Sequence, residues 1–490
     1  MKKLIAIFLV AVMALSLLAC SKQDPQVQQA GEGEFVWEGK TPEVEGFQVG
    51  FARRNISPTA PVPISGISAN STDRMSTSVH DTLYASALCM TDTEGNTYMF
   101  MTWDLQGLYA SVWNVIRDTV ASETGIPREN IYMTTTHTHS GPAVGSDEVA
   151  YMEEYRGMLG AQCIAAAKEA VLDRKPAEMY YGSAETENLN FVRRYFMDDG
   201  SFTTDNFPGT GTKVVSHETE ADPQLVMTRF VREGGKDIVM INWQGHPKGS
   251  APYSHTTATS NYVGILRDRV EKALDCESLF FLSGSGNVNN GSQIPEEDAI
   301  AENYIVLGEK LAAHAVEAAA NFQPVQTDTI QTTQAMVTED GVKGDSGVAL
   351  YAMSMGDLAF VFAPFETFDT NAMAVKETSK FPMTFYASCS NDDRGYLPTP
   401  PSFDWEITYE ADITKYPKGT SENVQTILIQ LLDELFTAGG YTEKPKAEGY
   451  ITPAFEPYTD GEYTNPTPGD LSACTPVKNG FYQLTVLDGS

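Results

Sequence analysis

The sequence predicts an α/β fold: a single large domain built on a mixed β-sheet with flanking helices. Three observations predict it. Apolar segments of strand length alternate with segments of helical periodicity, which is the pattern of a sheet covered by helices. Tight turns at Asp92-Thr-Glu-Gly95 and Gly356-Asp357 join neighbouring apolar segments, so antiparallel hairpins are expected as well. The chain has 490 residues and 42% hydrophobic content, which is enough to bury a large core.

The first 20 residues predict an export signal. A Lys2-Lys3 pair precedes an apolar run from Leu4 to Leu18, which is short for a membrane-spanning helix. The run closes on Leu17-Leu-Ala-Cys20, which resembles the lipobox of bacterial lipoproteins, where the cysteine becomes the lipid-bearing first residue. This resemblance implies an exported protein of the cell envelope, anchored to a membrane through lipid on Cys20. An ordinary signal peptide with an incidental cysteine is the alternative. Residues 21–45 are expected to be a linker.

The folded part is expected to begin at residue 46. Strands are expected where short runs are rich in β-branched, aromatic and other apolar residues, at residues 47–51, 83–91, 97–103, from 131 onward, 179–184, 238–243, 279–282, 348–355 and 358–362. Helices are expected from the helical spacing and composition of residues 111–124, 149–172, 265–274, 296–320 and 421–436. Pro and Gly become frequent after residue 439, so residues 439–490 are expected to be a C-terminal tail.

Charge and cysteine content exclude some classes of protein. The formal net charge is −32, and phosphate backbones need a basic surface, so no nucleic-acid partner is expected. None of the six cysteines forms a C-x-x-C pair, which excludes a cysteine-rich zinc cluster. A small fold held together by disulfides is excluded by the length of the chain.

Two histidines lie in the strand that is expected to begin at Ile131. Side chains alternate between the faces of a strand, so His137 and His139 are expected to point the same way. Ser140-Gly-Pro142 then ends the strand, because Pro cannot donate to a ladder and Gly permits a sharp turn. Two imidazoles that leave a sheet edge together are typical of a metal site or an acid–base site. Two half-buried histidines bonded to backbone carbonyls are the structural alternative.

Further candidate ligands follow other strands. His246 comes soon after residues 238–243, Glu366 follows residues 358–362, and Tyr396 lies in a polar segment. Strand ends in an α/β sheet gather distant parts of the chain into one cleft. Two imidazoles and a carboxylate suit Zn²⁺ with one position left for water. Because zinc lowers the pKa of bound water to about 7, the chemistry predicted from these residues is hydrolysis.

Five motifs occur in order along the chain: Thr136-His-Thr-His-Ser-Gly-Pro142, Asn242-Trp-Gln-Gly-His246, Gly286-Asn-Val-Asn-Asn290, Pro364-Phe-Glu366 and Gly395-Tyr-Leu-Pro-Thr399. Together they span most of residues 46–436 and resemble the neutral/alkaline, non-lysosomal ceramidase family. The resemblance implies a zinc hydrolase domain over residues 46–438. It also implies a set of site residues: the zinc ligands His137, His246, Glu366 and Tyr396, a proton-transferring His139 that faces the substrate carbonyl, and a substrate-contacting Arg193, or Arg194 in a shifted register.

Two features depart from the family pattern. The family's loop carries a serine proposed to act in catalysis, inside a Gly-Asp-Val-Ser-Pro-Asn run, and this chain has Asn287 and Asn289 at the places of the Asp and the Ser. Asn289 is expected to orient the substrate or to donate a hydrogen bond to the oxyanion, so the expected nucleophile is water activated by zinc. The family also carries a C-terminal immunoglobulin-like domain of about a hundred residues. The tail after residue 439 is expected to be too short for one.

The sequence therefore predicts a Zn²⁺-dependent hydrolase that cleaves an N-acyl amide bond in ceramide or a related N-acyl compound. The alternative is a non-catalytic surface lipoprotein that binds lipid or glycan and keeps a vestigial metal site. Two other hydrolase classes fit less well. A TIM-barrel amidohydrolase needs eight regular βα units, against which the hairpins argue. A metallo-β-lactamase needs Asp-His where this chain has Gly141 and Pro142. No oligomeric state is predicted.

Overall fold

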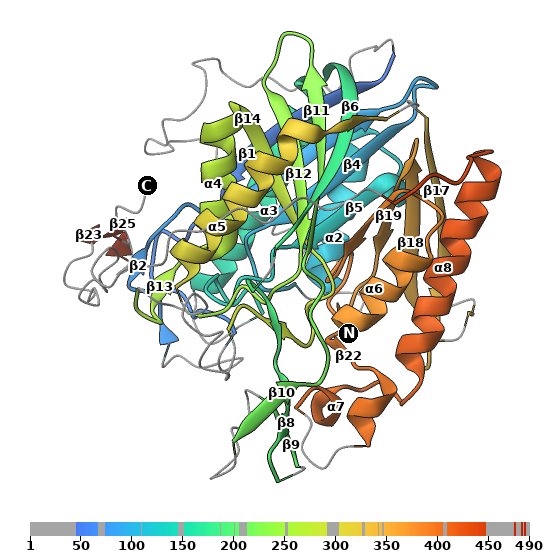
Figure 1. Cartoon of the computed structure of the whole chain (residues 1–490). Helices are drawn as coiled ribbons and strands as arrows, with labels where there is room; N and C mark the ends of the chain where they lie inside the picture. The colour runs from blue at the N-terminus through green and yellow to red at the C-terminus, as the bar shows by residue number, and fades with distance from the viewer. Residues whose placement is uncertain are drawn as a thin grey trace, which may run out of the picture.

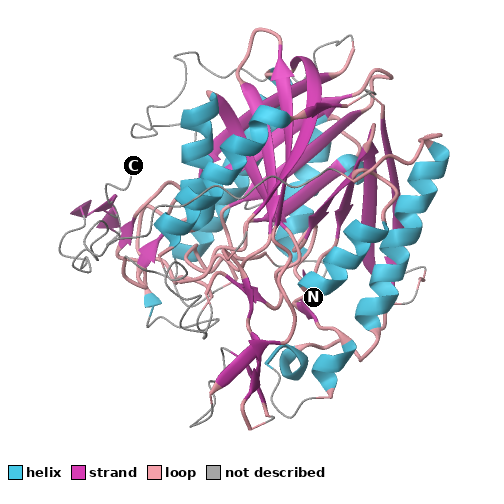
Figure 2. Cartoon of the chain, in the orientation of Figure 1, coloured by secondary structure: helices cyan, strands magenta, loops and turns pink. Residues whose placement is uncertain are grey.

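Two stacked β-sheets form the centre of the molecule, and helices cover the outer face of each sheet (Figures 1 and 2). The computed structural model describes residues 46–446, together with three residue pairs between 475 and 486. Within 46–446 it leaves out residues 67–73, 109, 146–150, 187, 200, 205–212, 250–252, 292–302, 326–328, 342, 345–346 and 405–408. The predicted signal peptide, the linker and most of the predicted tail lie outside the described residues, so the domain boundaries stay predictions.

The larger sheet has nine strands of mixed direction. Its main path runs through β14 (Cys276–Leu282), β12 (Asp237–Trp243), β11 (Gln224–Arg232), β6 (Lys175–Glu185), β1 (Gln48–Asn55), β3 (Tyr84–Thr91), β4 (Thr97–Trp103) and β5 (Ile131–Thr135), with β16 (Gln323–Pro324) on β6. The pairs β4/β5 and β12/β14 are parallel. The other pairs are antiparallel, which agrees with the expected mixed sheet and not with a TIM barrel.

The smaller sheet has four strands, β17 (Ile330–Val337), β18 (Val348–Met355), β19 (Leu358–Phe362) and β21 (Met383–Ala387). The β18–β19 connection is the predicted hairpin at Gly356-Asp357, and β19 and β21 are parallel. Short strands complete the fold: β2 (Ser78–Val79), β7 (Phe191–Val192), β8 (Arg194–Met197), β9 (Phe202–Thr204), β10 (Val214–His217), β13 (Thr257–Ala258), β15 (Val288–Asn289), β20 (Glu366–Thr367), β22 (Tyr396–Leu397), β23 (Thr475–Pro476), β24 (Tyr482–Gln483) and β25 (Thr485–Val486).

Helices form the two outer layers (Figure 1). The helices are α2 (Ala110–Thr124), α3 (Tyr151–Leu172), α4 (Tyr262–Leu274), α5 (Tyr304–Ala318), α6 (Asp369–Thr378), α7 (Tyr409–Ile413) and α8 (Thr420–Ala438). The first four pack on the larger sheet, and α6 and α8 pack on the smaller one. The first part of the expected helix 296–320, up to residue 302, lies outside the described residues. No helix in the described part of the chain is long and apolar enough to cross a membrane.

Side-chain alternation along the strands builds the core. In β4, Phe100 points between the two sheets, whereas Met99 and Met101 point toward the helices. The Phe100 ring contacts Phe360 and Phe362 of the smaller sheet, with centroid distances of 5.6 and 5.4 Å. Both faces of the larger sheet are therefore apolar, as expected for a sheet covered on both sides.

Three βαβ units set the position of the functional site. They are β4–α2–β5, β12–α4–β14 and β19–α6–β21, and each ends in a parallel pair. Ser388, which follows β21, joins the other two units. Its N–H donates to Leu282 O at the end of β14 (2.9 Å), and its carbonyl accepts from Thr134 Oγ1 of β5 (3.0 Å). The carboxyl ends of the three units thus meet, and ligands bind at such strand ends in α/β sheets.

Candidate metal centre

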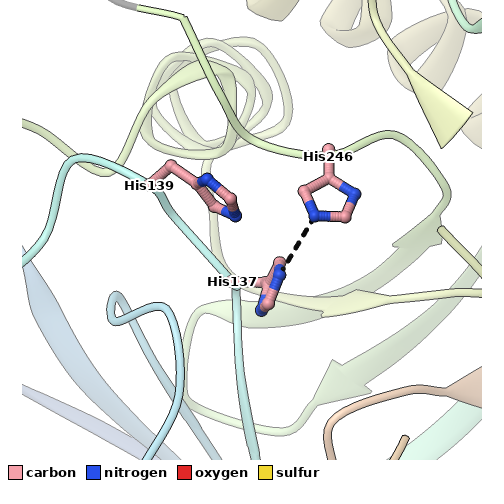
Figure 3. Close-up of side chains that lie close together, drawn as sticks. All are labelled: His137, His139 and His246. Carbon is pink, nitrogen blue, oxygen red and sulfur yellow. Dashed lines mark hydrogen bonds between the residues drawn. The ribbon is translucent and has the colours of Figure 1, made fainter. Parts of the chain in front are cut away.

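Two imidazoles and a carboxylate meet where the three βαβ units end. His137 follows β5, His246 follows β12, and Glu366 follows β19. Nε2 of His137 lies 3.2 Å from Nε2 of His246. Glu366 Oε2 lies 3.4 Å from each of these nitrogens. Figure 3 shows the His137 and His246 rings meeting nitrogen to nitrogen, with His139 beside them; the planes of the first two rings are 77° apart.

Backbone carbonyls fix the orientation of all three imidazoles. Nδ1 of His137 lies 2.7 Å from Gln106 O, and Nδ1 of His246 lies 2.8 Å from Ser285 O. Nδ1 of His139 lies 3.0 Å from the carbonyl oxygen of Gly66. A carbonyl only accepts, so each Nδ1 carries a proton and Nε2 is left as the ring atom that can bind a metal ion. This is the arrangement that usually orients a metal-binding histidine.

The Nε2 atoms of His137 and His246 and Oε2 of Glu366 are arranged as ligands of a metal ion and not as hydrogen-bond partners of one another. Two bare Nε2 atoms cannot donate to each other, so the 3.2 Å contact is not a hydrogen bond between neutral rings. Glu366 Oε2 is buried and accepts no hydrogen bond from the described residues. Ligands placed about 2.0–2.1 Å from a tetrahedral Zn²⁺ are roughly 3.3–3.4 Å apart. The triangle of 3.2, 3.4 and 3.4 Å therefore has the size of one face of such a site.

The loop at His137 differs from the expected geometry. Strand β5 ends at Thr135, and His137 has a φ of 63°, in the left-handed region that non-glycine residues seldom adopt. The prediction that His137 and His139 lie in this strand, on one face of it, is therefore wrong. A tight turn brings the two rings together instead, with centroids 5.0 Å apart.

His139 completes a cluster of three buried histidines whose candidate ligand atoms all lie within 4.8 Å of one another. Its Nε2 lies 3.3 Å from the side-chain nitrogen of Gln106, so the amide donates and Nε2 accepts. The residue across from it must be glycine, because Gly66 has a φ of 105° and a Cβ there would collide with the His139 ring. His139 is thus held in the neutral form that can accept a proton.

Burial and neighbouring charges set the protonation states. Burial alone would raise the pKa of Glu366, but His137 and His246 outweigh it and hold that pKa well below its usual value. Burial is also the main reason that the pKa of His246 falls to about 4 and the pKa of His139 falls well below its usual value. Burial opposes the charged form of His137 as well, but Cys389 and Glu366 raise its pKa. The site thus combines an ionised carboxylate with neutral imidazoles at His139 and His246.

Tyr396 lies next to Glu366 because β20 and β22 pair in parallel, with Glu366 opposite Tyr396. The Arg193 guanidinium lies over the Tyr396 ring, 5.5 Å from its centroid. Burial and Glu366 raise the pKa of Tyr396 well above its usual value, and Arg193 partly offsets them. The structure thus brings Tyr396 to the carboxylate, and its role as a fourth ligand stays a prediction.

Of the two candidate arginines, Arg193 is the one beside Tyr396. Arg193 Nε donates to Glu410 Oε1 (2.8 Å), and Nη2 donates to Gly286 O (2.8 Å). Arg194 instead donates to Glu218 and to the other oxygen of Glu410. The geometry is consistent with the register that assigns the site role to Arg193.

Asn289 lies in β15, one residue after Val288, whose carbonyl accepts the backbone N–H of His246 (3.0 Å). It is 1% exposed, and its strand pairs with β7, which directly precedes Arg193. Asn289 is therefore held close to the predicted ligand His246 and to the predicted substrate-contacting Arg193. Its action on a substrate stays a prediction.

Sequence reasoning missed three residues at the site. Gln106 orients His137 through its carbonyl and His139 through its side chain. Cys389 Sγ lies 3.7 Å from His137 Nδ1, and Glu410 holds Arg193. Gln106 could have been found by the same rule as His246, because it follows closely after a predicted strand. Nothing in the sequence near Glu410 marks it, because its partners come from a distant segment.

An α/β sandwich whose strand ends gather buried histidines and a carboxylate defines a class: enzymes with a site at the carboxyl ends of parallel strands. Residues 47–338 match the profile of the family described as neutral/alkaline non-lysosomal ceramidase, N-terminal. The chain belongs to this family, as its motifs predicted, and family and fold together make it a hydrolase of the ceramidase type. Glu366 and Tyr396 lie beyond the matched residues.

Solved structures show the same fold. Neutral ceramidase from Pseudomonas aeruginosa is similar with a TM-score of 0.66 and 15% sequence identity, over 84% of this chain and 77% of that one. A ceramidase complexed with C2 is similar with a TM-score of 0.65 and 14% identity, over 84% and 78%. No curated protein sequence matches the chain. The predicted fold class, a mixed-sheet α/β domain like that of neutral ceramidase, is confirmed.

Proposed function

We propose that the protein is a zinc-dependent hydrolase that cleaves the N-acyl amide bond of ceramide or of a related N-acyl compound. The observation that carries the proposal is the triangle of two imidazole Nε2 atoms and one carboxylate oxygen, with edges of 3.2, 3.4 and 3.4 Å. Membership of the ceramidase family supports the substrate class. An amide that links an acyl chain to an amine is the bond that such an enzyme would break.

His137, His246 and Glu366 would hold the ion, with Tyr396 as a fourth ligand. Two neutral imidazoles and a carboxylate are the donor set of several catalytic zinc sites. When bound, Zn²⁺ lowers the pKa of a water ligand to about 7 and polarises a carbonyl oxygen. The carbonyls of Gln106 and Ser285 keep the two imidazoles oriented for this task.

The chain's other residues would manage protons and substrate. His139 is neutral, and its Nε2 lone pair, which accepts from the Gln106 amide, could take a proton from attacking water and return it to the leaving amine. Asn289 would donate a hydrogen bond to the oxyanion or orient the amide. Arg193 would contact the substrate next to Tyr396.

Export and anchoring complete the proposal. The segment that ends in Cys20 would direct the chain to the cell envelope, and lipid on that cysteine would hold it at a membrane. An enzyme tethered to a membrane meets substrates that are themselves lipids. Ceramide-like compounds are such substrates.

The test is a panel of N-acyl amides, ceramide included, with N-acyl esters and glycan amides as comparisons. We expect zinc-loaded protein to release free amine from the N-acyl amides, and chelation followed by zinc readdition to abolish and restore that release. A panel with no metal-dependent turnover, but with binding of lipid or glycan, would favour a non-catalytic lipoprotein.

A further inference from the structure

One loop, the segment after β14, holds both His246 and Arg193 in place. Its backbone, from Ser283 to Asn290, carries Ser285 O, which accepts from His246 Nδ1 (2.8 Å), and Val288 O, which accepts from the His246 amide (3.0 Å). The same loop accepts two hydrogen bonds from Arg193, at the carbonyls of Gly286 (2.8 Å) and Asn287 (2.9 Å).

The loop also contacts the strand that carries Glu366. The Gly286 N–H donates to Thr367 O (2.8 Å), one residue beyond the carboxylate. Gly286 has no room for a side chain, because a Cβ there would collide with the carbonyl of Glu366. A shift of this loop would therefore displace His246, Arg193 and the Glu366 strand together.

A pair of side chains fastens the loop to helix α6. Asn287 Nδ2 donates to Asp369 Oδ1 (2.7 Å), and the Asp369 backbone N–H donates to Asn287 Oδ1 (2.9 Å). Both residues are 1% exposed. Within the described part of the chain, no donor reaches Asp369 Oδ2, so the amide of Asn287 is the side-chain partner of a buried carboxyl. Asp369 is the first residue of α6.

We infer that the Asn287–Asp369 pair is a positioning device for the metal centre, and that the loop needs an amide at position 287 because this side chain faces Asp369. A carboxylate at position 287 could still accept the backbone N–H of Asp369. It could not donate to Oδ1, and two carboxylates in contact cannot both stay ionised. An amide meets both requirements without sharing a proton. The pair touches no proposed substrate atom, so it acts only through the loop.

Amide hydrogen exchange tests this inference on the full chain without metal. Asn287→Ala removes both hydrogen bonds of the pair, and Asp369→Ala removes the one that Oδ1 accepts, so each should raise exchange of the His246, Gly286 and Val288 amides by about tenfold or more. Asp369→Asn keeps the accepting Oδ1 and should stay within about twofold of the parent. Asn371→Ala is the control: it removes an amide side chain from the helix that carries Asp369, and its Nδ2 has no hydrogen-bond partner among the described residues.

A double-mutant cycle shows whether Asn287 and Asp369 act as a coupled pair or independently of each other. The Asn287→Ala/Asp369→Ala double variant should exchange no faster than the worse single variant. Zinc retention against a chelator should follow the same pattern, with a loss of about tenfold or more in the Ala variants. Additive effects, or single Ala variants that behave like Asn371→Ala, would overturn the inference. Exchange is measured without metal or substrate, so failure of the proposed hydrolysis would leave this result standing.

The Asn287→Asp variant tests the need for an amide. In this variant the carboxyl at position 287 faces the carboxyl of Asp369, and the contact between them persists only while the two share a proton. The ratio of the amide exchange rate in the variant to that in the parent should therefore rise as pH rises through neutrality. Among the described residues, Asp222 and Glu218 also raise the pKa of Asp369 by their charge, and they are paired with Lys376 and Arg194. A ratio to the parent that stays near one at every pH would show that an amide is not needed.

Discussion

At the scale of single residues, the site depends on how each histidine is held. The turn at His137 costs backbone strain, since a left-handed φ in a non-glycine residue is unfavourable by roughly 1–3 kcal/mol. The bond from Nδ1 to Gln106 O and the neighbouring Glu366 favour this conformation. His139 needs no such strain, and its lone pair is free of the Glu366 contact. This difference separates a ligand role for His137 from a proton-transfer role for His139.

Replacing His139 should therefore cost more than replacing Asn289. We expect His139→Ala to lower kcat by about 10²–10⁴-fold, the usual contribution of a general acid–base group. Asn289→Ala should slow turnover without abolishing it, by no more than about 10²-fold, because it removes one hydrogen bond to the oxyanion. The measurement is kcat on the best N-acyl substrate, with zinc content checked in both variants.

A side-chain nucleophile is the competing account at this scale. Ser283 and Ser285 lie in the loop beside His246. Mass spectrometry of the enzyme stopped during turnover should find no acyl group on either serine. A covalent acyl-enzyme at Ser283 or Ser285 would contradict the water mechanism.

At the scale of elements, the buried carboxyl of Asp369 joins helix α6 to the loop after β14. Burial raises the pKa of Asp369 from 3.8 to about 7, with Asp222 and Glu218 adding to the effect and the Asn287 hydrogen bond opposing it. The folded state therefore binds a proton that the unfolded state has already lost between about pH 4 and 7. Stability due to this group falls as pH rises through that window.

Asp369→Asn should remove this dependence of stability on pH. The free energy of unfolding of the variant, relative to the parent, should rise by about 1–3 kcal/mol between pH 4 and pH 7. Any constant cost of the substitution cancels, because only the change with pH is compared. Denaturant unfolding at several pH values measures it, and a pH-independent difference would show that the carboxyl is not protonated in the fold.

Local patterns in the sequence predicted the elements and part of the site. Continuous apolar runs predicted β3, β4, β12 and the β18–β19 hairpin, which are buried along nearly their whole length, and strand ends marked His246 and Glu366. The turn at His137 could not be read, because its left-handed backbone is held by Gln106 and Glu366 from other elements. The second, stacked sheet was also missed, since which strands share a sheet is decided by long-range pairing.

At the scale of the whole molecule, the net charge of −32 keeps the protein from anionic surfaces, so its place at a membrane would depend on lipid at Cys20. Cys20→Ala should move the protein from the membrane fraction to the soluble fraction, or leave the leader uncleaved. Fractionation with an antibody to the folded domain, together with the mass of the mature chain, measures both. Unchanged fractionation and processing would show that Cys20 does not carry the anchor.

His246 lies more than 100 residues along the chain from both His137 and Glu366, yet the fold brings the three side chains together. A shared metal ion explains why two imidazole nitrogens and a carboxylate oxygen meet there. Elemental analysis of purified His246→Ala tests that account most directly, with the exposed His255→Ala as a matched control. We predict about one zinc per chain in the parent and in His255→Ala, and near-complete loss in His246→Ala. Full zinc occupancy in His246→Ala would contradict the assignment of this site.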